Sequence, residues 1–86
     1  MNNPESIPVI HRFYEAIDTL IVKKEIRGVQ TFTRQYHINR WNFSTVRKNP
    51  ESDMFQLSWL SYIVNDYGVS ADWLLTGRGK MFKGNK

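Results

Sequence analysis

The side chains of this sequence that could act together on a partner lie between positions 39 and 45. They combine hydrogen-bonding groups with one flat aromatic ring: Asn39, Arg40, Trp41, Asn42, Ser44 and Thr45. Arginine and asparagine can each make paired hydrogen bonds to a planar edge, and serine and threonine can add single bonds. This chemistry fits the base edges and phosphates of nucleic acid.

The apolar residues around this set fall at helical intervals. Phe32 and Tyr36 lie four residues apart and Phe43 and Val46 three apart, while Ile38 stands alone between the two pairs. Such spacing predicts two short helices that cross steeply over a shared core, a helix-turn-helix, with Ile38 at the corner. We expect these helices at about Gln30 to Tyr36 and at Arg40 to Lys48, the second one capped by Asn39.

The second of these helices has a core side and an outer side. At about 100° of rotation per residue, Phe43 and Val46 point inward. The remaining positions are polar, basic or aromatic: Trp41, Ser44, Thr45 and Lys48 lie opposite the core, Arg40 and Arg47 on one flank, and Asn42 on the other. An outward tryptophan exposes a large apolar surface that something should cover. The major groove of duplex DNA, a groove of its own chain and a dimer contact are the three alternatives.

A DNA-reading role gives each of these residues a contact. We expect Arg40 to pair with a guanine edge or a phosphate, Asn42 with adenine, and Trp41 to lie against thymine methyl groups. Ser44 and Thr45 would touch base edges or phosphates. The expected phosphate contacts are Gln30, Arg34, Arg47 and Lys48. For Arg34 and Lys48, a plain solvated surface is the alternative.

The other segments also predict helices, so the expected fold class is all-α, a compact five-helix bundle. A first helix should run from a Ser6 cap to about Arg27 and end at Gly28. A fourth should follow a Ser52 or Asp53 cap and end at Gly68, and a last short helix should run from a Ser70 cap to Gly77. The fourth helix should bury one stripe of residues: Leu57, Leu60, Val64 and Tyr67.

Length and composition bound the molecule to one small domain. The 86 residues divide into an N-terminal arm (1–6), a helix-turn-helix domain (7–77) and a basic tail (78–86) that should be loose beyond Phe82. Lys and Arg outnumber Asp and Glu by 12 to 8, which favours a polyanionic partner. There is no cysteine, no apolar run of about 20 residues that could span a bilayer and no secretory signal. We therefore expect a cytoplasmic protein without disulfides or membrane contact.

Catalytic and ligand-binding chemistry finds little support in the sequence. His11 and His37 belong to separate segments, and a zinc site would need a denser cluster. The fragment G-R-G-K lacks the spacing and the following Ser or Thr of a phosphate loop. Carboxylates are scattered and no nucleophile–base pair is visible. We expect no enzyme activity, no catalytic residue, no cofactor, no metal and no small-molecule ligand.

The stretch from Phe32 to Lys48, followed by the segment G-V-S-A-D-W-L-L-T-G-R-G-K-M-F, resembles the phage lambda-repressor-like (Xre-type) helix-turn-helix family. The resemblance covers about Arg12 to Phe82. It implies a five-helix bundle that binds duplex DNA sequence-specifically, commonly as a dimer on a palindromic operator. It also implies that the third helix is the recognition helix and that its base-contacting positions match Asn39, Arg40, Trp41, Ser44 and Thr45.

The sequence departs from the family pattern around the turn and after the third helix. Histidine replaces the usual turn glycine, threonine replaces the small alanine at the helix crossing, valine precedes the glutamine that opens the second helix, and two carboxylates occupy the following loop: His37, Thr33, Val29, Glu51 and Asp53. Histidine tolerates a left-handed backbone better than most residues, so the turn can form. The carboxylates would weaken a phosphate contact of that loop, or serve as caps for the fourth helix.

Two functions from different classes follow. The first is a transcriptional regulator of bacterial or phage type that reads duplex DNA, with a homodimer formed through part of a C-terminal apolar group: Trp73, Leu74, Leu75, Met81 and Phe82. The alternative is a protein-interaction module, antitoxin-like or accessory, that keeps the fold without base readout and uses Trp41 as an anchor. A DNA reader should select a motif and lose affinity steeply with salt, whereas the module should do neither.

Overall fold

Five α-helices make up the architecture of residues 4–83, which the computed structural model describes. A short 3-10 turn leads into them: η1 (Pro4–Ser6), α1 (Ile7–Val22), α2 (Val29–Gln35), α3 (Arg40–Lys48), α4 (Leu57–Tyr67) and α5 (Ala71–Thr76). In this part of the chain, β-pairing is limited to one isolated antiparallel bridge between Val69 and Phe82. The predicted all-α class is therefore confirmed.

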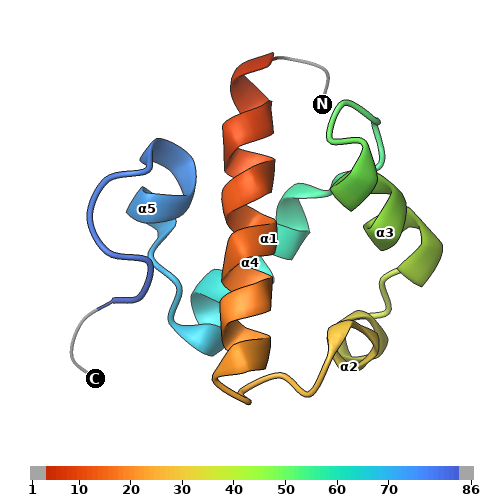
Figure 1. The fold of residues 1–86 in the computed structure, drawn as a ribbon, viewed down its shortest axis with the longest axis horizontal. Coiled ribbons are helices and arrows are strands. Elements are labelled where there is room, and N and C mark those ends of the chain that lie inside the picture. Colours follow the sequence, from red (N-terminus) through yellow and green to blue (C-terminus); the bar gives the residue numbers. More distant parts are fainter. Residues whose placement is uncertain (1–3, 84–86) are drawn as a thin grey trace.

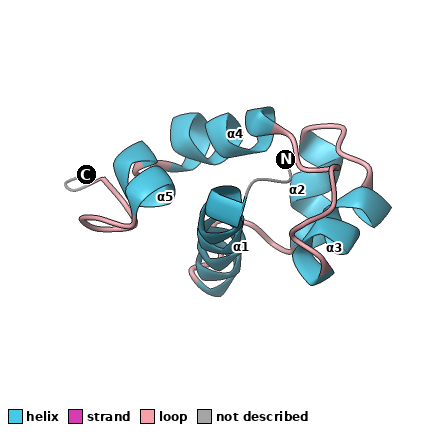
Figure 2. Cartoon of the chain, turned by 90° about the horizontal axis from the view of Figure 1, so that it is seen from above, coloured by secondary structure: helices cyan, strands magenta, loops and turns pink. Residues whose placement is uncertain are grey.

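The longest helix, α1, stands between the other elements. Figure 1 shows α2 and α3 on one side of α1 and α5 on the other, while α4 passes behind it. Figure 2 gives the same arrangement from above, with α4 beside α5 and α2 beside α3. The α2–α3 pair and the α4–α5 pair therefore offer two different outer surfaces.

Phe13 of α1 is the centre of the core. Its side chain is fully buried, and its ring lies 6.2 Å from that of Phe32, 5.9 Å from Phe43, 5.6 Å from Phe55 and 6.1 Å from Trp59. Aromatic pairs at such distances in tilted or edge-on arrangements add to the free energy of burial. Phe13 of α1 thus contacts aromatic side chains of α2, α3 and α4.

The first helix is shorter than predicted. It ends at Val22 instead of reaching about Arg27, and Lys24 takes a left-handed conformation with φ 67°. Position 24 would continue the buried stripe of α1, where a lysine cannot stay. Ending the helix keeps Lys24 exposed and lets Ile26 turn inward, where it is 2% exposed. Gly28 does not end α1 but precedes α2 in an extended conformation.

Helix caps follow the prediction at three ends of α4 and α5. Ser70 accepts a hydrogen bond from the backbone N–H of Trp73, and Gly68 and Gly77 end their helices in the left-handed region with φ 73° and 79°. Ser6, by contrast, makes no capping hydrogen bond with its side chain, because the 3-10 turn leads directly into α1. The second helix lies one residue earlier than the predicted 30–36.

The fourth helix starts later than predicted. Gln56 precedes its first residue, and neither Ser52 nor Asp53 caps it. The hydroxyl of Ser52 instead accepts a hydrogen bond from the N–H of Met54 within the preceding turn. This turn brings Phe55 into the core, where its ring meets those of Phe13 and Trp59.

The buried stripe of α4 also differs from the prediction. Leu57 is 66% exposed, and Val64 and Tyr67 are only half-buried. The buried positions are Trp59, Leu60 and Ile63. Trp59 determines which side of α4 faces the core, because its large ring fills the space between the aromatic rings from α1 and α3.

The two ends of the chain are only partly described. The predicted N-terminal arm contains η1, and its residues 1–3 lie outside the described part, as do residues 84–86 of the predicted loose tail. The rest of the tail returns to the α4–α5 connection, where the N–H of Ser70 donates to the carbonyl of Met81 and the N–H of Lys83 donates to that of Gly68. Within residues 4–83, no helix is both long and apolar enough to cross a membrane.

Candidate nucleic-acid interface

The candidate interface is built on α3, whose bounds match the predicted Arg40 to Lys48. Asn39 is extended at φ −65° and ψ 117°, and its side-chain oxygen accepts a hydrogen bond of 3.0 Å from the backbone N–H of Asn42. This is the expected N-terminal cap. The oxygen of Asn39 forms this cap, and its amide nitrogen is available to donate to a partner.

The connection from α2 to α3 is a tight turn. His37 takes the left-handed conformation, with φ 57°, which histidine tolerates better than most residues. The next residue, Ile38, is half-buried against the core and donates its N–H to the carbonyl of Thr33 at 2.8 Å. Thr33 is 3% exposed, and its hydroxyl donates to the carbonyl of Gln30. This buried hydroxyl therefore has a hydrogen-bond partner where α2 and α3 cross.

The outer face of α3 carries an uncovered tryptophan. Trp41 is 68% exposed, whereas Phe43 is 1% exposed and Val46 is fully buried. The predicted orientation of the helix is therefore confirmed. The alternative in which Trp41 is buried in a groove of its own chain is wrong, because most of its surface faces solvent. Beside it, Ser44 is exposed and Thr45 half-buried.

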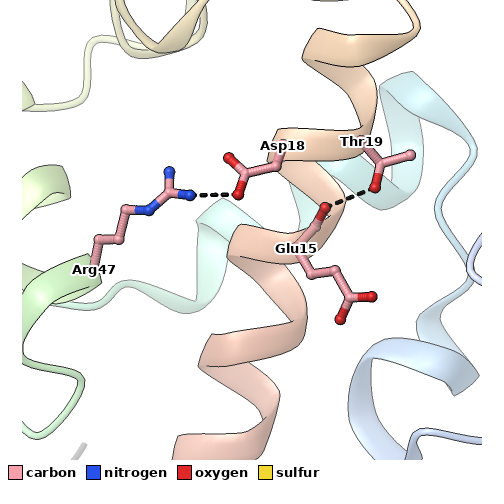
Figure 3. A network of polar contacts seen from close by, with 4 residues as sticks. All are labelled: Glu15, Asp18, Thr19 and Arg47. Carbon is pink, nitrogen blue, oxygen red and sulfur yellow. Dashed lines mark hydrogen bonds and ion pairs between the residues drawn. The ribbon is translucent and has the colours of Figure 1, made fainter.

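The positive charges on and near α3 fall into two kinds. Arg34, Arg40 and Lys48 are exposed and make no ion pair within residues 4–83. Arg47 differs, because its guanidinium binds the carboxylate of Asp18 on α1 (Figure 3). Three of these four cations are therefore available for phosphate in the free protein.

The α2 residues expected to contact phosphate share one outer side. Gln30 and Arg34 are both exposed and lie one helical turn apart, while Phe32 and Thr33 between them are buried. The structure brings Gln30 and Arg34 onto one face of a helix that adjoins α3.

A polar pocket of about 240 Å³ at the start of α3 was not anticipated from the sequence. It brings Asn39 and Asn42 together with polar residues before and along α4: Gln56, Ser58 and Tyr62. Neutral amides and hydroxyls are common partners of DNA phosphate and sugar oxygens. The signal that could have indicated this site is a pair of exposed polar residues, Gln56 and Ser58, at a helix start.

A tyrosine cluster ties the end of α2 to α4. The hydroxyl of Tyr36 donates to the carboxylate of Asp66 at 2.5 Å, and the rings of Tyr36 and Tyr62 stack at 4.1 Å. Burial and the bond to Asp66 raise the pKa of the Tyr36 hydroxyl above its usual value. This cluster holds the turn before α3 against α4. The apolar spacing of the sequence predicts a core position for Tyr36 but not these polar contacts.

The carboxylates after α3 do not serve as caps for α4. Glu51 is exposed, and its backbone N–H donates to the side chain of Asn49 within the turn. The alternative in which Glu51 or Asp53 caps α4 is wrong, because Gln56 occupies that position. A negative charge therefore lies in the loop that follows the basic end of α3.

A second exposed surface is an apolar groove of about 240 Å³ between α4 and α5. Its lining residues are Leu57, Leu60, Ser61, Val64, Ala71, Leu74 and Leu75. Leu57 and Leu75 are 66% and 57% exposed. Of the predicted C-terminal apolar group, Trp73 and Leu74 seal the core, Met81 and Phe82 are half-buried, and Leu75 remains outside.

Comparison with protein-family models, curated proteins and solved structures finds no match to this chain. Residues 4–83 contain no group of three or more His, Cys, Asp or Glu side chains with a geometry that could hold a metal ion.

Proposed function

We propose that this chain is a duplex DNA-binding transcriptional regulator of bacterial or phage type with a lambda-repressor-like arrangement of its helices. In this proposal α2 and α3 act as a helix-turn-helix, and α3 enters the major groove. The observation that carries the proposal is Trp41, a tryptophan 68% exposed on a helix whose other outward residues are polar or basic. An aromatic ring in such surroundings suits a partner that offers both apolar edges and hydrogen-bonding groups.

Base contacts follow from the positions along the outer face of α3. Arg40 at the helix start pairs with a guanine edge, Asn42 with adenine, and Trp41 lies against thymine methyl groups. Ser44 and Thr45, farther along the helix, make single hydrogen bonds. Asn39 contributes its amide nitrogen as a donor, while its oxygen caps the helix.

Phosphate contacts come from the exposed residues around this face. Arg34 and Lys48 supply charges that release counterions from the DNA backbone, and Gln30 supplies a neutral amide at the start of α2. The absence of an ion pair at Arg34, Arg40 or Lys48 within residues 4–83 supports these roles, since no internal bond must break first. The phosphate contact predicted for Arg47 competes with its bond to Asp18.

A regulator of this kind reads a palindrome when two copies associate. We place the two-fold contact on the apolar groove between α4 and α5, with Leu75 of one copy against Leu57 and Val64 of the other. The groove is lined by no charged residue, so two chains that each carry a net charge of +4 can approach there with the least repulsion.

The test is a selection from a random duplex library at near-physiological salt, followed by sequencing of the retained fraction. Wild type should enrich a palindromic motif, and Trp41→Ala and Arg40→Ala should lose it. Both side chains are exposed, so both variants should fold normally, which circular dichroism would check.

The opposite result favours the interaction-module hypothesis, in which the exposed ring of Trp41 anchors a partner protein. In that case the library yields no motif, and any retention is weak and equal for all sequences. A pull-down with wild type and Trp41→Ala would then identify a partner that only the wild type retains.

A further inference from the structure

Two polar contacts join α1 to α3, one helical turn apart on each helix. The hydroxyl of Tyr14 donates a buried hydrogen bond of 2.6 Å to the carbonyl of Phe43. The carboxylate of Asp18 accepts from the guanidinium of Arg47, as Figure 3 shows. Residues 14 and 18 share one face of α1, and residues 43 and 47 share one face of α3. The two helices are therefore joined at two points that lie side by side.

The two points are also linked to each other. The guanidinium carbon of Arg47 lies 5.3 Å from the centre of the Tyr14 ring, and the Tyr14 and Phe43 rings meet edge to face at 5.0 Å. A planar guanidinium can bind a carboxylate and lie over an aromatic ring at the same time, which an ammonium group does less well. Arg47 is thus held on two sides by residues of α1.

The two polar contacts between α1 and α3 fix the orientation of α3 more narrowly than its apolar core contacts do. Phe43 and Val46 hold the helix by burial, which is not directional. The turn before α3 is held by the left-handed His37, and the polar Thr33 occupies the crossing. Even a rotation of α3 small enough to leave Phe43 and Val46 buried would move the outward Trp41 and Arg40 sideways.

The ion pair is too exposed to serve mainly as a stabilising contact. The side chains of Arg47 and Asp18 are 40% and 50% exposed, and ion pairs of this kind contribute little to folding. Directional bonds matter more for geometry, and an error of about 1 Å in the placement of recognition groups is enough to weaken their contacts.

We propose that Tyr14, Asp18 and Arg47 form a clamp that sets the angle of α3, so that Asp18 and Arg47 are positioning residues for base discrimination. The clamp rests on the proposed DNA-reading function. It assigns Arg47 to α1 rather than to a phosphate, and it gives a carboxylate of α1 a positive role in binding a polyanion.

The test measures the affinity of variants for the selected duplex and for a duplex with one base pair changed, over a range of salt concentrations. Asp18→Asn removes a negative charge, and electrostatics alone would tighten its binding to DNA. The clamp predicts the opposite sign, with about three- to tenfold weaker binding to the selected duplex and reduced discrimination. Glu15→Gln is the matched control, because Glu15 is exposed on the same helix and its side chain points away from Arg47 (Figure 3).

Arg47→Gln separates positioning from phosphate binding. A lost phosphate contact lowers the slope of log affinity against log salt by about one, whereas a lost clamp leaves the slope unchanged. Arg47→Lys should behave like Arg47→Gln in discrimination although it keeps the charge. The double variant Asp18→Asn/Arg47→Gln should be no worse than either single variant, since both remove the same bond.

The clamp is overturned if Asp18→Asn binds the selected duplex as tightly as Glu15→Gln or more tightly, or if Arg47→Gln lowers the salt slope by about one. A wild-type chain that selects no duplex overturns the proposed function, and the positioning role with it. The two failures are distinguishable, because only the second abolishes the wild-type motif.

Discussion

Trp41 on α3 and the leucines of the α4–α5 groove are both exposed apolar surface, but their neighbours differ. Trp41 is surrounded by charged and hydrogen-bonding residues, whereas Leu57 and Leu75 border a groove with almost no polar atom. A mixed surface can distinguish partners by the positions of their polar groups, while a purely apolar one gains only from burial. This difference supports the proposal that α3 binds a partner with many polar groups and that the groove binds an apolar surface.

The largest expected effect separates the two sides of α3. Phe43→Ala should lower the free energy of unfolding by about 3–5 kcal/mol, because it leaves a cavity beneath the aromatic core. Trp41→Ala should change that free energy by less than about 0.5 kcal/mol, because its ring is exposed. Urea unfolding followed by circular dichroism gives both values. A strongly destabilised Trp41→Ala would mean that the ring packs against its own chain after all.

The next effect concerns DNA affinity. Trp41→Ala should weaken binding to the selected duplex by about 10- to 100-fold, the range expected for loss of a base contact. Fluorescence anisotropy with a labelled half-site measures this without the contribution of a dimer. Leu75→Ala is the control from the other surface and should bind the half-site as wild type does. Equal losses of DNA affinity in Trp41→Ala and Leu75→Ala would contradict the proposed difference between the α3 surface and the groove.

The groove has its own reciprocal test. Leu57→Ser with Leu75→Ser should raise the dissociation constant of the dimer at least about tenfold, since two leucines per copy lose their burial. Sedimentation equilibrium measures it, and Trp41→Ser is the control that should leave association unchanged. A wild-type chain that stays monomeric at high concentration would remove the two-fold contact from the proposal and leave the half-site binding intact.

A smaller effect comes from the basic end of α3. Lys48→Gln should lower the slope of log affinity against log salt by about one and weaken binding equally for all sequences. Lys83→Gln makes the same chemical change on the tail beside α5 and should keep the wild-type slope. The result that counts against the proposed interface is an unchanged slope in Lys48→Gln.

The smallest effect concerns how α3 is attached to the core. Burial raises the pKa of the Tyr14 hydroxyl, although the nearby charge of Arg47 opposes the shift. The folded chain therefore keeps a proton that the unfolded chain releases above about pH 10, so stability should fall as the pH rises past that value. Tyr14→Phe should be about 1 kcal/mol less stable at neutral pH and show a shallower loss at high pH. Unfolding measurements at both pH values test this, and an unchanged loss in the variant would contradict it.

The α3 segment could be predicted from the sequence because its signals agree with each other. Phe43 and Val46 allow only one inward face, Asn39 is a strong cap, and Pro50 follows the last turn. The same residues leave Trp41 outward whatever the rest of the chain does. Local signals of this kind determined both the bounds and the orientation of the candidate recognition helix.

The α4 segment could not be predicted in the same way because it contains two helical stripes. Leu57, Leu60 and Val64 form one, and Trp59, Leu60 and Ile63 form the other. Only the space beside the Phe13 ring decided that the tryptophan stripe is buried, and this space exists only once α1 and α3 have packed. The exposed stripe then became one wall of the apolar groove.

By itself, the sequence determined the helical class, the outer face of α3 and the caps at Asn39, Ser70 and Gly77, since each depends on residues within a few positions of one another. Only the tertiary structure decided where α1 stops, which stripe of α4 is buried, and that Arg47 binds Asp18 across 29 positions of the chain. The physical reason is that these outcomes depend on which side chains share a limited space, and packing alone brings such distant residues together.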